Sequence, residues 1–177
     1  AREGARLDRV IAETSWTLPT HASMLTGISS AVHQVQTDGK SLAPGFTTLA
    51  EVLRDAGYRT RGLWSGPYLH PLFGLGQGFA EGVLADLRGY DSAASPDSSQ
   101  VLAAKTANFA AAVDAVTSPT LIDKAIAFLE QPHDRPFFLF IHMFDVHFDY
   151  KPPEAIWRRF DPDYTGTFTD DQHANNP

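Results

Sequence analysis

The feature that most restricts the fold is an uninterrupted apolar run, Phe137-Phe138-Leu139-Phe140-Ile141, which follows Pro136 and ends at His142. A strand with one solvated face alternates apolar and polar residues. A continuous apolar run of this length is instead typical of a strand buried on both faces, as in parallel sheets covered by helices. The run therefore predicts a buried parallel strand in an α/β protein.

A second segment has the order helix, glycine, strand. Within Thr47–Ala56, apolar residues recur at helical spacing, Thr47 or Thr48 can cap the helix, and Gly57 can end it. Tyr58–Ser65 then has the composition of a strand. This order is an αβ unit, the building block of a parallel sheet with helices on its faces. The apolar positions of the predicted helix are Leu49, Val52 and Leu53.

The remaining segments are predicted from their composition and from the positions of glycine and proline. Arg6–Ala12 has the pattern of a strand, and Gly62–Gly82, with six glycines and two prolines, has that of a long loop. Tyr90–Gln100 is predicted to be a solvated linker, followed by an alanine-rich helix over Val101–Val116. A further helix is expected from Ser118 to about Glu130, with one face formed by Leu121, Ile122, Ala125, Ile126 and Leu129.

Composition excludes several classes of function. The net charge is −7 and basic residues cluster only at the pair Arg158-Arg159, so a nucleic-acid partner is not expected. No stretch approaches the roughly 18 consecutive apolar residues of a membrane span. There is no cysteine, which excludes disulfides, thiolate metal sites and a cysteine nucleophile within these residues. We expect the sequence to be truncated at both ends, so the presence of a signal peptide cannot be judged and the localisation stays open.

A threonine stands two residues before a proline in the stretch Ser15–Gly27. Pro19 suits the first position of a helix because its φ is fixed and it has no N–H, and Gly27 suits the position just past a two-turn helix. Thr17 would then face the unpaired N–H groups and positive dipole of the helix, where anions bind. Thr17 is therefore a candidate nucleophile, although such a threonine can also be an ordinary cap or turn residue.

Three titratable side chains follow the apolar strand within six residues: His142, Asp145 and His147. In parallel α/β sheets, ligands bind just beyond the carboxyl ends of the strands. Imidazole and carboxylate groups at such a place can ligate a metal, hold a proton or bind an anion. A solvated loop with chance histidines is the alternative interpretation.

The stretch from Thr17 to Gly27 is similar to the signature of the sulfatase family, within the alkaline-phosphatase-like superfamily. In that signature a nucleophile, any residue, proline, any residue and arginine precede Ala-Ser-Leu-Leu-Thr-Gly. Thr17 takes the nucleophile position and His21 the arginine position. The sequence is therefore expected to hold part of a sulfatase-like active site.

Three more segments resemble the family in the same order. Leu49–Thr60 is similar to its leucine-rich helix, Ala-Gly-Tyr turn and strand, and Phe73–Phe79 to a loop before a variable stretch. Pro136–Pro153 is similar to the segment in which a hydrophobic strand ends in His-x-x-Asp-x-His, followed by an aromatic residue and two prolines. The resemblance spans about Leu7–Pro153.

The resemblance implies an internal segment of an alkaline-phosphatase-like sandwich, in which helices flank a mostly parallel sheet. Residues 1–177 would form a partial sulfatase-like domain, truncated at both ends. It would comprise a nucleophile half (1–89), a linker and helix (90–118), and a helix, strand and Asp-x-His loop (119–153).

Roles for the site residues follow from the resemblance. His147 is expected beside the ester oxygen, as a general acid or leaving-group stabiliser, and His21 is expected to assist catalysis. Thr20, His142 and Asp145 are candidates for substrate contacts. For His142 and Asp145, proximity favours a supporting or structural role over metal ligation.

The sequence departs from the sulfatase pattern at three positions. In the sulfatase family a dedicated enzyme oxidises a cysteine, less often a serine, at the nucleophile position to formylglycine. Thr17 cannot be converted in this way, and neither Ser15 nor Ser23 stands two residues before the proline. His21 replaces an arginine, and a lysine expected near Ser65 is missing. A Thr-x-Pro-x-His arrangement does resemble nucleotide pyrophosphatase/phosphodiesterases, whose threonine attacks while bound to a metal. Coordination to a divalent cation is a recognised way to activate a hydroxyl.

These observations predict a metal-dependent hydrolase of sulfate or phosphate esters, with a small-molecule, glycan or lipid anionic ester as substrate. The metal, calcium, manganese or zinc, would bind Thr17, and the resemblance places most of its ligands outside these residues. The segment alone is therefore expected to be inactive. The alternatives are a head-group phosphotransferase with the same threonine intermediate and a sulfatase-like binding protein that has lost catalysis. Oligomeric state is left open.

Overall fold

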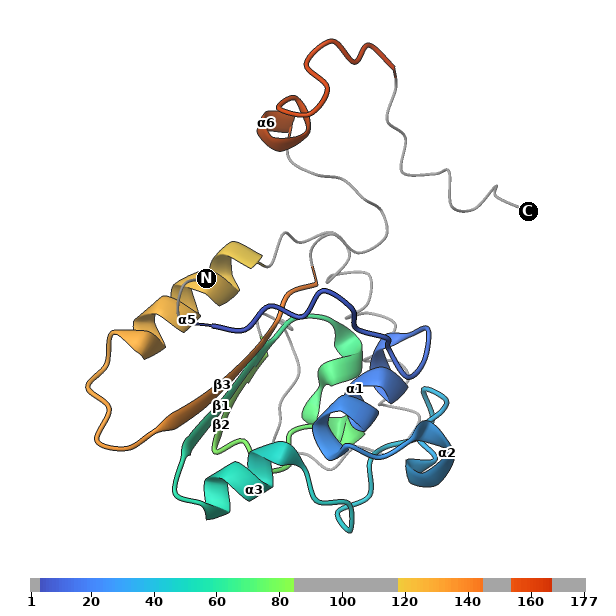
Figure 1. Cartoon of the computed structure of the whole chain (residues 1–177), viewed down its shortest axis with the longest axis vertical. Coiled ribbons are helices and arrows are strands. Elements are labelled where there is room, and N and C mark those ends of the chain that lie inside the picture. Colours follow the sequence, from blue (N-terminus) through green and yellow to red (C-terminus); the bar gives the residue numbers. More distant parts are fainter. Residues whose placement is uncertain (1–3, 85–117, 145–153, 167–177) are drawn as a thin grey trace.

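The computed structural model describes residues 4–84, 118–144 and 154–166. At its centre is a three-stranded sheet in the order β2-β1-β3 (Figure 1). Both pairings are parallel, so the carboxyl ends of the strands meet at one edge, where Trp64 of β1 lies opposite His142 of β3. The expected α/β class with a parallel sheet is confirmed. The strands are β1 (Arg59–Trp64), β2 (Glu81–Leu84) and β3 (Phe137–His142).

Helices flank this sheet, and the helices expected around residues 47–56 and from Ser118 onward are both present. Figure 1 shows α5 on one side of the sheet and α1 with α3 on the other. The helices are α1 (Thr17–Thr26), α2 (Ser30–His33), α3 (Leu49–Asp55), α5 (Ser118–Leu129) and α6 (Glu154–Trp157), with the short 3-10 helices η1 (Pro67–Leu69) and η2 (Pro71–Phe73).

Alternation along β1 divides the core into two layers. Leu63 faces α5 and is fully buried against Leu121 and Ala125, whereas Trp64 points to the opposite face. There it joins the larger cluster around α1 and the loop after β1. Strand β3 packs against both clusters, Phe140 on the larger and Leu139 and Ile141 on the smaller, but it is only partly buried and Phe137 is 38% exposed, so the full burial expected from its apolar run is not found among the described residues. The larger cluster comprises Leu18, Ala22, Leu25, Val35, Leu42, Trp64, Leu69, Phe73 and Leu75.

The expected apolar faces of the helices were only partly correct. On α5, Leu121, Ala125 and Phe128 are buried, but Ile122, Ile126 and Leu129 are 38–50% exposed. Positions i, i+4 and i+7 rest on the sheet, and the adjacent stripe does not reach it. On α3, Ala50 is the buried residue, and Leu49 and Val52 are 45% and 54% exposed.

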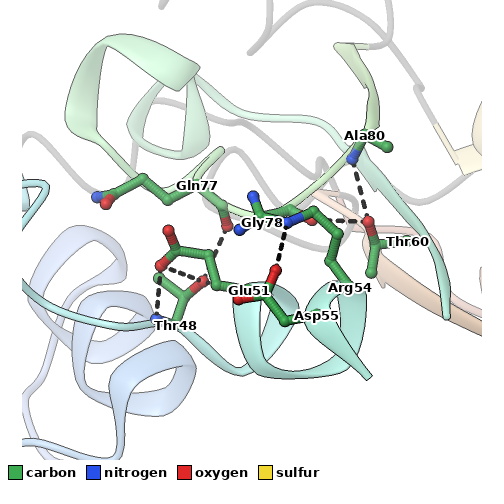
Figure 2. A network of polar contacts seen from close by, with 8 residues as sticks. All are labelled: Thr48, Glu51, Arg54, Asp55, Thr60, Gln77, Gly78 and Ala80. Carbon is green, nitrogen blue, oxygen red and sulfur yellow. Dashed lines mark hydrogen bonds and ion pairs between the residues drawn. The ribbon is translucent and has the colours of Figure 1, made fainter. Parts of the chain in front are cut away.

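Two threonine hydroxyls fix the chain that leads into β2 (Figure 2). Thr48 caps α3 in a capping box with Glu51, and its hydroxyl also donates to the carbonyl of Gln77 at 2.9 Å. The Thr60 hydroxyl donates to Gly78 O at 2.6 Å and accepts from Ala80 N at 3.1 Å. Gly78 has φ +85°, and a side chain there would collide with the α3 backbone. This close approach explains why the loop needs glycine at that position.

The structure corrects three predictions about local structure. Residues 6–12 form no strand, and Leu7, Val10 and Ile11 are 72–95% exposed because no described strand lies beside them. Helix α1 begins at Thr17, so Pro19 is its third residue, where the missing N–H costs nothing because first-turn N–H groups have no helical partner. Gly27 caps α1 with φ +68°, as expected, although the helix is ten residues long.

The third correction concerns residues 62–82, which are not one long loop. They include the end of β1, both 3-10 helices and the start of β2. Glycines at 66, 74 and 78 with positive φ provide the turns between these short elements. The predicted linker at 90–100 and helix at 101–116 lie outside the described residues, as do Asp145 and His147.

Candidate active site

Thr17 is the first residue of α1 and is partly buried. The N-cap residue, Trp16, makes no side-chain cap bond, and the first turn has no acidic residue. The N–H groups of this turn therefore keep the partial positive charge that attracts anions. Among the described residues, none forms a hydrogen bond with the Thr17 hydroxyl. A hydroxyl of this kind at a helix N-terminus is suitably placed to act on an anionic group.

His21 lies one helical turn after Thr17, on the same face of α1. Its Nδ1 donates to the Thr17 carbonyl oxygen at 2.7 Å. A carbonyl only accepts, so this bond assigns the proton of the neutral ring to Nδ1 and leaves a lone pair on Nε2. Burial lowers the pKa of His21, and the bond to Thr17 opposes this only in part. His21 is thus a neutral imidazole near pH 7, unlike the arginine whose position it occupies.

His142 ends β3 and is held by Ser65, the residue that follows β1. Its Nδ1 donates to the carbonyl oxygen of Ser65 at 2.9 Å, and the backbone N–H of Ser65 donates to the His142 carbonyl at 3.1 Å. The Ser65 hydroxyl accepts from the N–H of Phe144 at 2.8 Å. These bonds fix both the ring of His142 and the path of the chain toward residue 145.

The fold brings His21 and His142 together from distant parts of the sequence. Their rings meet edge to face, with centroids 4.8 Å apart and an interplanar angle of 85°. Phe140 also contacts the His21 ring, at 6.2 Å between centroids. Thr17, His21 and His142 therefore gather where the N-terminus of α1 meets the carboxyl edge of the sheet, the usual place for ligands in an α/β fold.

The hydroxyls of two further residues considered from the sequence, Thr20 and Ser23, form hydrogen bonds within the protein. The Thr20 hydroxyl lies 2.8 Å from that of Thr14 and donates to the Thr14 carbonyl at 3.0 Å, so it ties the preceding segment to α1. Its contact with substrate stays a prediction. The Ser23 hydroxyl is buried and bonded to His33 Nε2 at 2.9 Å, which removes it as a replacement nucleophile.

Sequence reasoning noticed Ser65 only as the place of a missing lysine. The structure shows it as the residue that joins the ends of β1 and β3. Gly66 follows with φ +97°, and a Cβ there would lie 2.7 Å from Cδ2 of Phe144. A small polar residue and a glycine directly after a buried strand were the available sequence signal for this turn.

Aromatic rings border the site beside Thr17. Trp16 and Tyr68 meet edge to face at 5.3 Å, and both are partly buried against the larger core cluster. Burial raises the pKa of Tyr68, and the negative charge of Asp38 adds to the effect. Tyr68 is therefore a neutral phenol at physiological pH.

The donors here fit a divalent metal only in part. The Thr17 hydroxyl and the imidazole nitrogen of a neutral histidine such as His21 are metal-ligand types. Within residues 4–84, 118–144 and 154–166, no three His, Cys, Asp or Glu side chains gather as a metal centre. A complete site would need ligands from elsewhere. In the same ranges, no helix has the length and apolar character to cross a membrane.

A comparison with family models identifies the family of this chain. The family model described as Sulfatase matches residues 1–176. A search of curated proteins found no match. The matched region includes the helix of Thr17, the strand ending at His142 and the residues between them. The chain belongs to the sulfatase family.

Proposed function

We propose that the protein is a metal-dependent hydrolase of sulfate or phosphate esters with Thr17 as its nucleophile. The observation that best supports the proposal is the position of Thr17: its hydroxyl stands in the uncapped first turn of α1, at the carboxyl edge of a parallel sheet. Membership of the sulfatase family points to the same ester chemistry. Family membership does not specify a threonine nucleophile, so this assignment is the new part of the proposal.

The chemistry follows from the charges that develop during attack. As Thr17 Oγ1 gives its proton to solvent water and bonds to phosphorus or sulfur, the bond to the ester oxygen breaks and negative charge grows on the non-bridging oxygens. The N–H groups of the first turn of α1 can stabilise that charge. His147 is proposed to give a proton to the departing alcohol, and water then releases the acid from Thr17.

Formylglycine chemistry does not fit this chain. Thr17 cannot form the aldehyde, and Ser23 is buried in a hydrogen bond with His33. An unassisted threonine hydroxyl is a poor nucleophile at neutral pH. A divalent metal ion, when bound, would supply the charge that lowers the pKa of this hydroxyl. Thr17 would be one of the residues that hold it.

The decisive experiment replaces Thr17 in the intact protein. Thr17→Val keeps the β-branched shape and removes only the hydroxyl, whereas Thr17→Ser keeps the hydroxyl. With aryl sulfate and aryl phosphate esters plus added zinc, manganese or calcium, we expect the valine variant to lose on the order of 10³-fold in kcat/KM. The serine variant should retain a measurable part of the activity.

Exposed Thr47 provides the matched control, because Thr47→Val should leave turnover unchanged. Turnover by Thr17→Val at the wild-type rate would remove Thr17 from the mechanism. Turnover that requires an added alcohol acceptor would identify a phosphotransferase. No turnover by the wild-type protein with any of the three metals would favour a binding protein.

A further inference from the structure

A buried histidine outside the candidate site, His33, is hydrogen-bonded to the helix that carries Thr17. It ends α2, is 4% exposed, and its Nε2 lies 2.9 Å from the hydroxyl oxygen of Ser23 in α1. We propose that His33 is a positioning residue for Thr17, because its bond to Ser23 fixes the rotation of α1 about the helix axis. The inference rests on the proposed role of Thr17 as nucleophile and adds a residue that acts on it through α1.

The direction of the bond between His33 and Ser23 follows from a second contact of the ring. The backbone N–H of Val35 donates to His33 Nδ1 at 3.0 Å, so Nδ1 carries a lone pair. Burial lowers the pKa of His33, and the negative charge of Glu13 and a backbone hydrogen bond with Pro19 oppose this only in part. The ring is therefore neutral near pH 7, and its proton is on Nε2, which donates to Ser23 Oγ. Because this tautomer cannot accept the proton of Ser23, the pair is an anchor and not a nucleophile with its base.

The ring of His33 is itself held by the turn that follows α2. Gln34 has φ +60°, the one positive φ of a non-glycine residue within residues 4–84, 118–144 and 154–166. Val35 comes next and is fully buried in the larger core cluster. At the start of α2, the cap residue Ser29 donates to Glu13 Oε1 at 2.7 Å. An uncommon backbone conformation persists where the surrounding structure requires it, so His33 is attached to the core and not to a loose surface loop.

Apolar packing alone does not determine how α1 is rotated. Leu18, Ala22 and Leu25 are 0–4% exposed, but hydrophobic contacts have no preferred direction. A hydrogen bond needs aligned donor and acceptor groups, so it resists a rotation that apolar contacts allow. Ser23 lies about 9 Å from Thr17 along the axis of α1, at 1.5 Å of rise per residue. Because a misplacement of about 1 Å can cost about 100-fold in rate, loss of this anchor should be visible in kcat.

Two substitutions of His33 separate the two bonds of its ring. In His33→Gln, the amide nitrogen can replace Nε2 and donate to Ser23, whereas in His33→Asn the amide oxygen can replace Nδ1 and accept from Val35. With the aryl esters and metals used for Thr17, we expect His33→Asn to lower kcat about tenfold or more while KM stays nearly constant. His33→Gln should retain most of the wild-type kcat. Ser23→Ala should resemble His33→Asn, and the double variant should show no further loss.

His133→Asn is the matched control. Neither ring nitrogen of His133 forms a hydrogen bond with a described residue, so this variant should keep the wild-type kcat. A His33→Asn variant with the kcat of this control would overturn the proposal. Equal losses in His33→Asn and His33→Gln would also overturn it, because the bond to Ser23 would then not be the one that matters.

Long-range ¹H–¹⁵N NMR gives a readout that needs no turnover. We expect the His33 ring of the wild-type protein to be protonated on Nε2. The amide resonances of the first turn of α1 should shift in His33→Asn and stay in place in His33→Gln. A proton on Nδ1, or first-turn resonances that His33→Asn leaves unchanged, would overturn the proposal. Thr17→Val should lose turnover and keep the His33 signals, so an inactive wild-type protein would reject the proposed function while these resonances still decide the role of His33.

Discussion

The Nδ1 atom of His142 donates to the carbonyl oxygen of Ser65 at 2.9 Å, and this bond joins the ends of two parallel strands at the candidate site. Ser65 is only 1% exposed, and its hydroxyl also accepts a hydrogen bond from the N–H of Phe144. The side chain of Ser65 thus determines where the chain goes after His142.

Ser65→Ala should lower the free energy of unfolding by about 1–2 kcal/mol, because it removes a buried acceptor of the Phe144 N–H. Urea unfolding of the variant measures the change. Ser41 is exposed and its side chain forms no hydrogen bond with a described residue, so Ser41→Ala should unfold at the wild-type midpoint. Equal midpoints for both variants would show that the Ser65 hydroxyl does not hold this turn.

Gly66→Ala should be more costly than an ordinary glycine replacement. Its φ of +97° disfavours any side chain, and the new methyl group would press on the ring of Phe144. We expect a loss of about 1–3 kcal/mol of stability. Gly45→Ala is the control, since a Cβ there meets nothing within 4 Å and its φ is not positive. A Gly66→Ala variant as stable as Gly45→Ala contradicts the strained turn.

Thr48→Ala should cost about 1–2 kcal/mol, because it removes the N-cap of α3 and the donor to the Gln77 carbonyl (Figure 2). Its neighbour Thr47 is exposed, so Thr47→Ala tests the same change of residue type without these bonds. Thermal unfolding of the two variants gives the comparison. A lower melting temperature in the Thr47 variant than in the Thr48 variant would disprove the assignment of the cap.

Stability should fall at mildly acidic pH because His70 is buried. Burial lowers its pKa to about 4 from 6.5, so the unfolded chain binds the proton more readily than the folded one. The contribution is complete above about pH 6.5 and is lost as the pH falls toward 4, by up to roughly 1.4 kcal/mol per pH unit. His70→Gln should flatten this slope in urea unfolding between pH 7 and 5. An unchanged slope would exclude His70 as its source.

The strongest sequence patterns predicted the elements that hold the site. The helix with its threonine cap and Gly57 and the helix from Ser118 were confirmed. The apolar run of residues 137–141 forms the expected parallel strand, but that strand is only partly buried. Each is a local pattern: periodicity, a cap and a stop act within a few residues. The strand expected over residues 6–12 was wrong because pairing needs a neighbouring strand, which composition cannot supply.

The sequence by itself determined the parallel α/β class, the sulfatase resemblance and Thr17 as the candidate nucleophile at a helix N-terminus. Only the tertiary structure decided which side chains meet that helix. The parallel register sets His142 opposite Trp64 at the strand ends, and the packing of α1 on the sheet brings His21 within 4.8 Å of it. The tautomers of both rings depend on carbonyl groups that backbone geometry alone positions. The bond between His142 and Ser65 and the ring contact between His21 and His142 join residues far apart in the chain, and no local pattern encodes their distance.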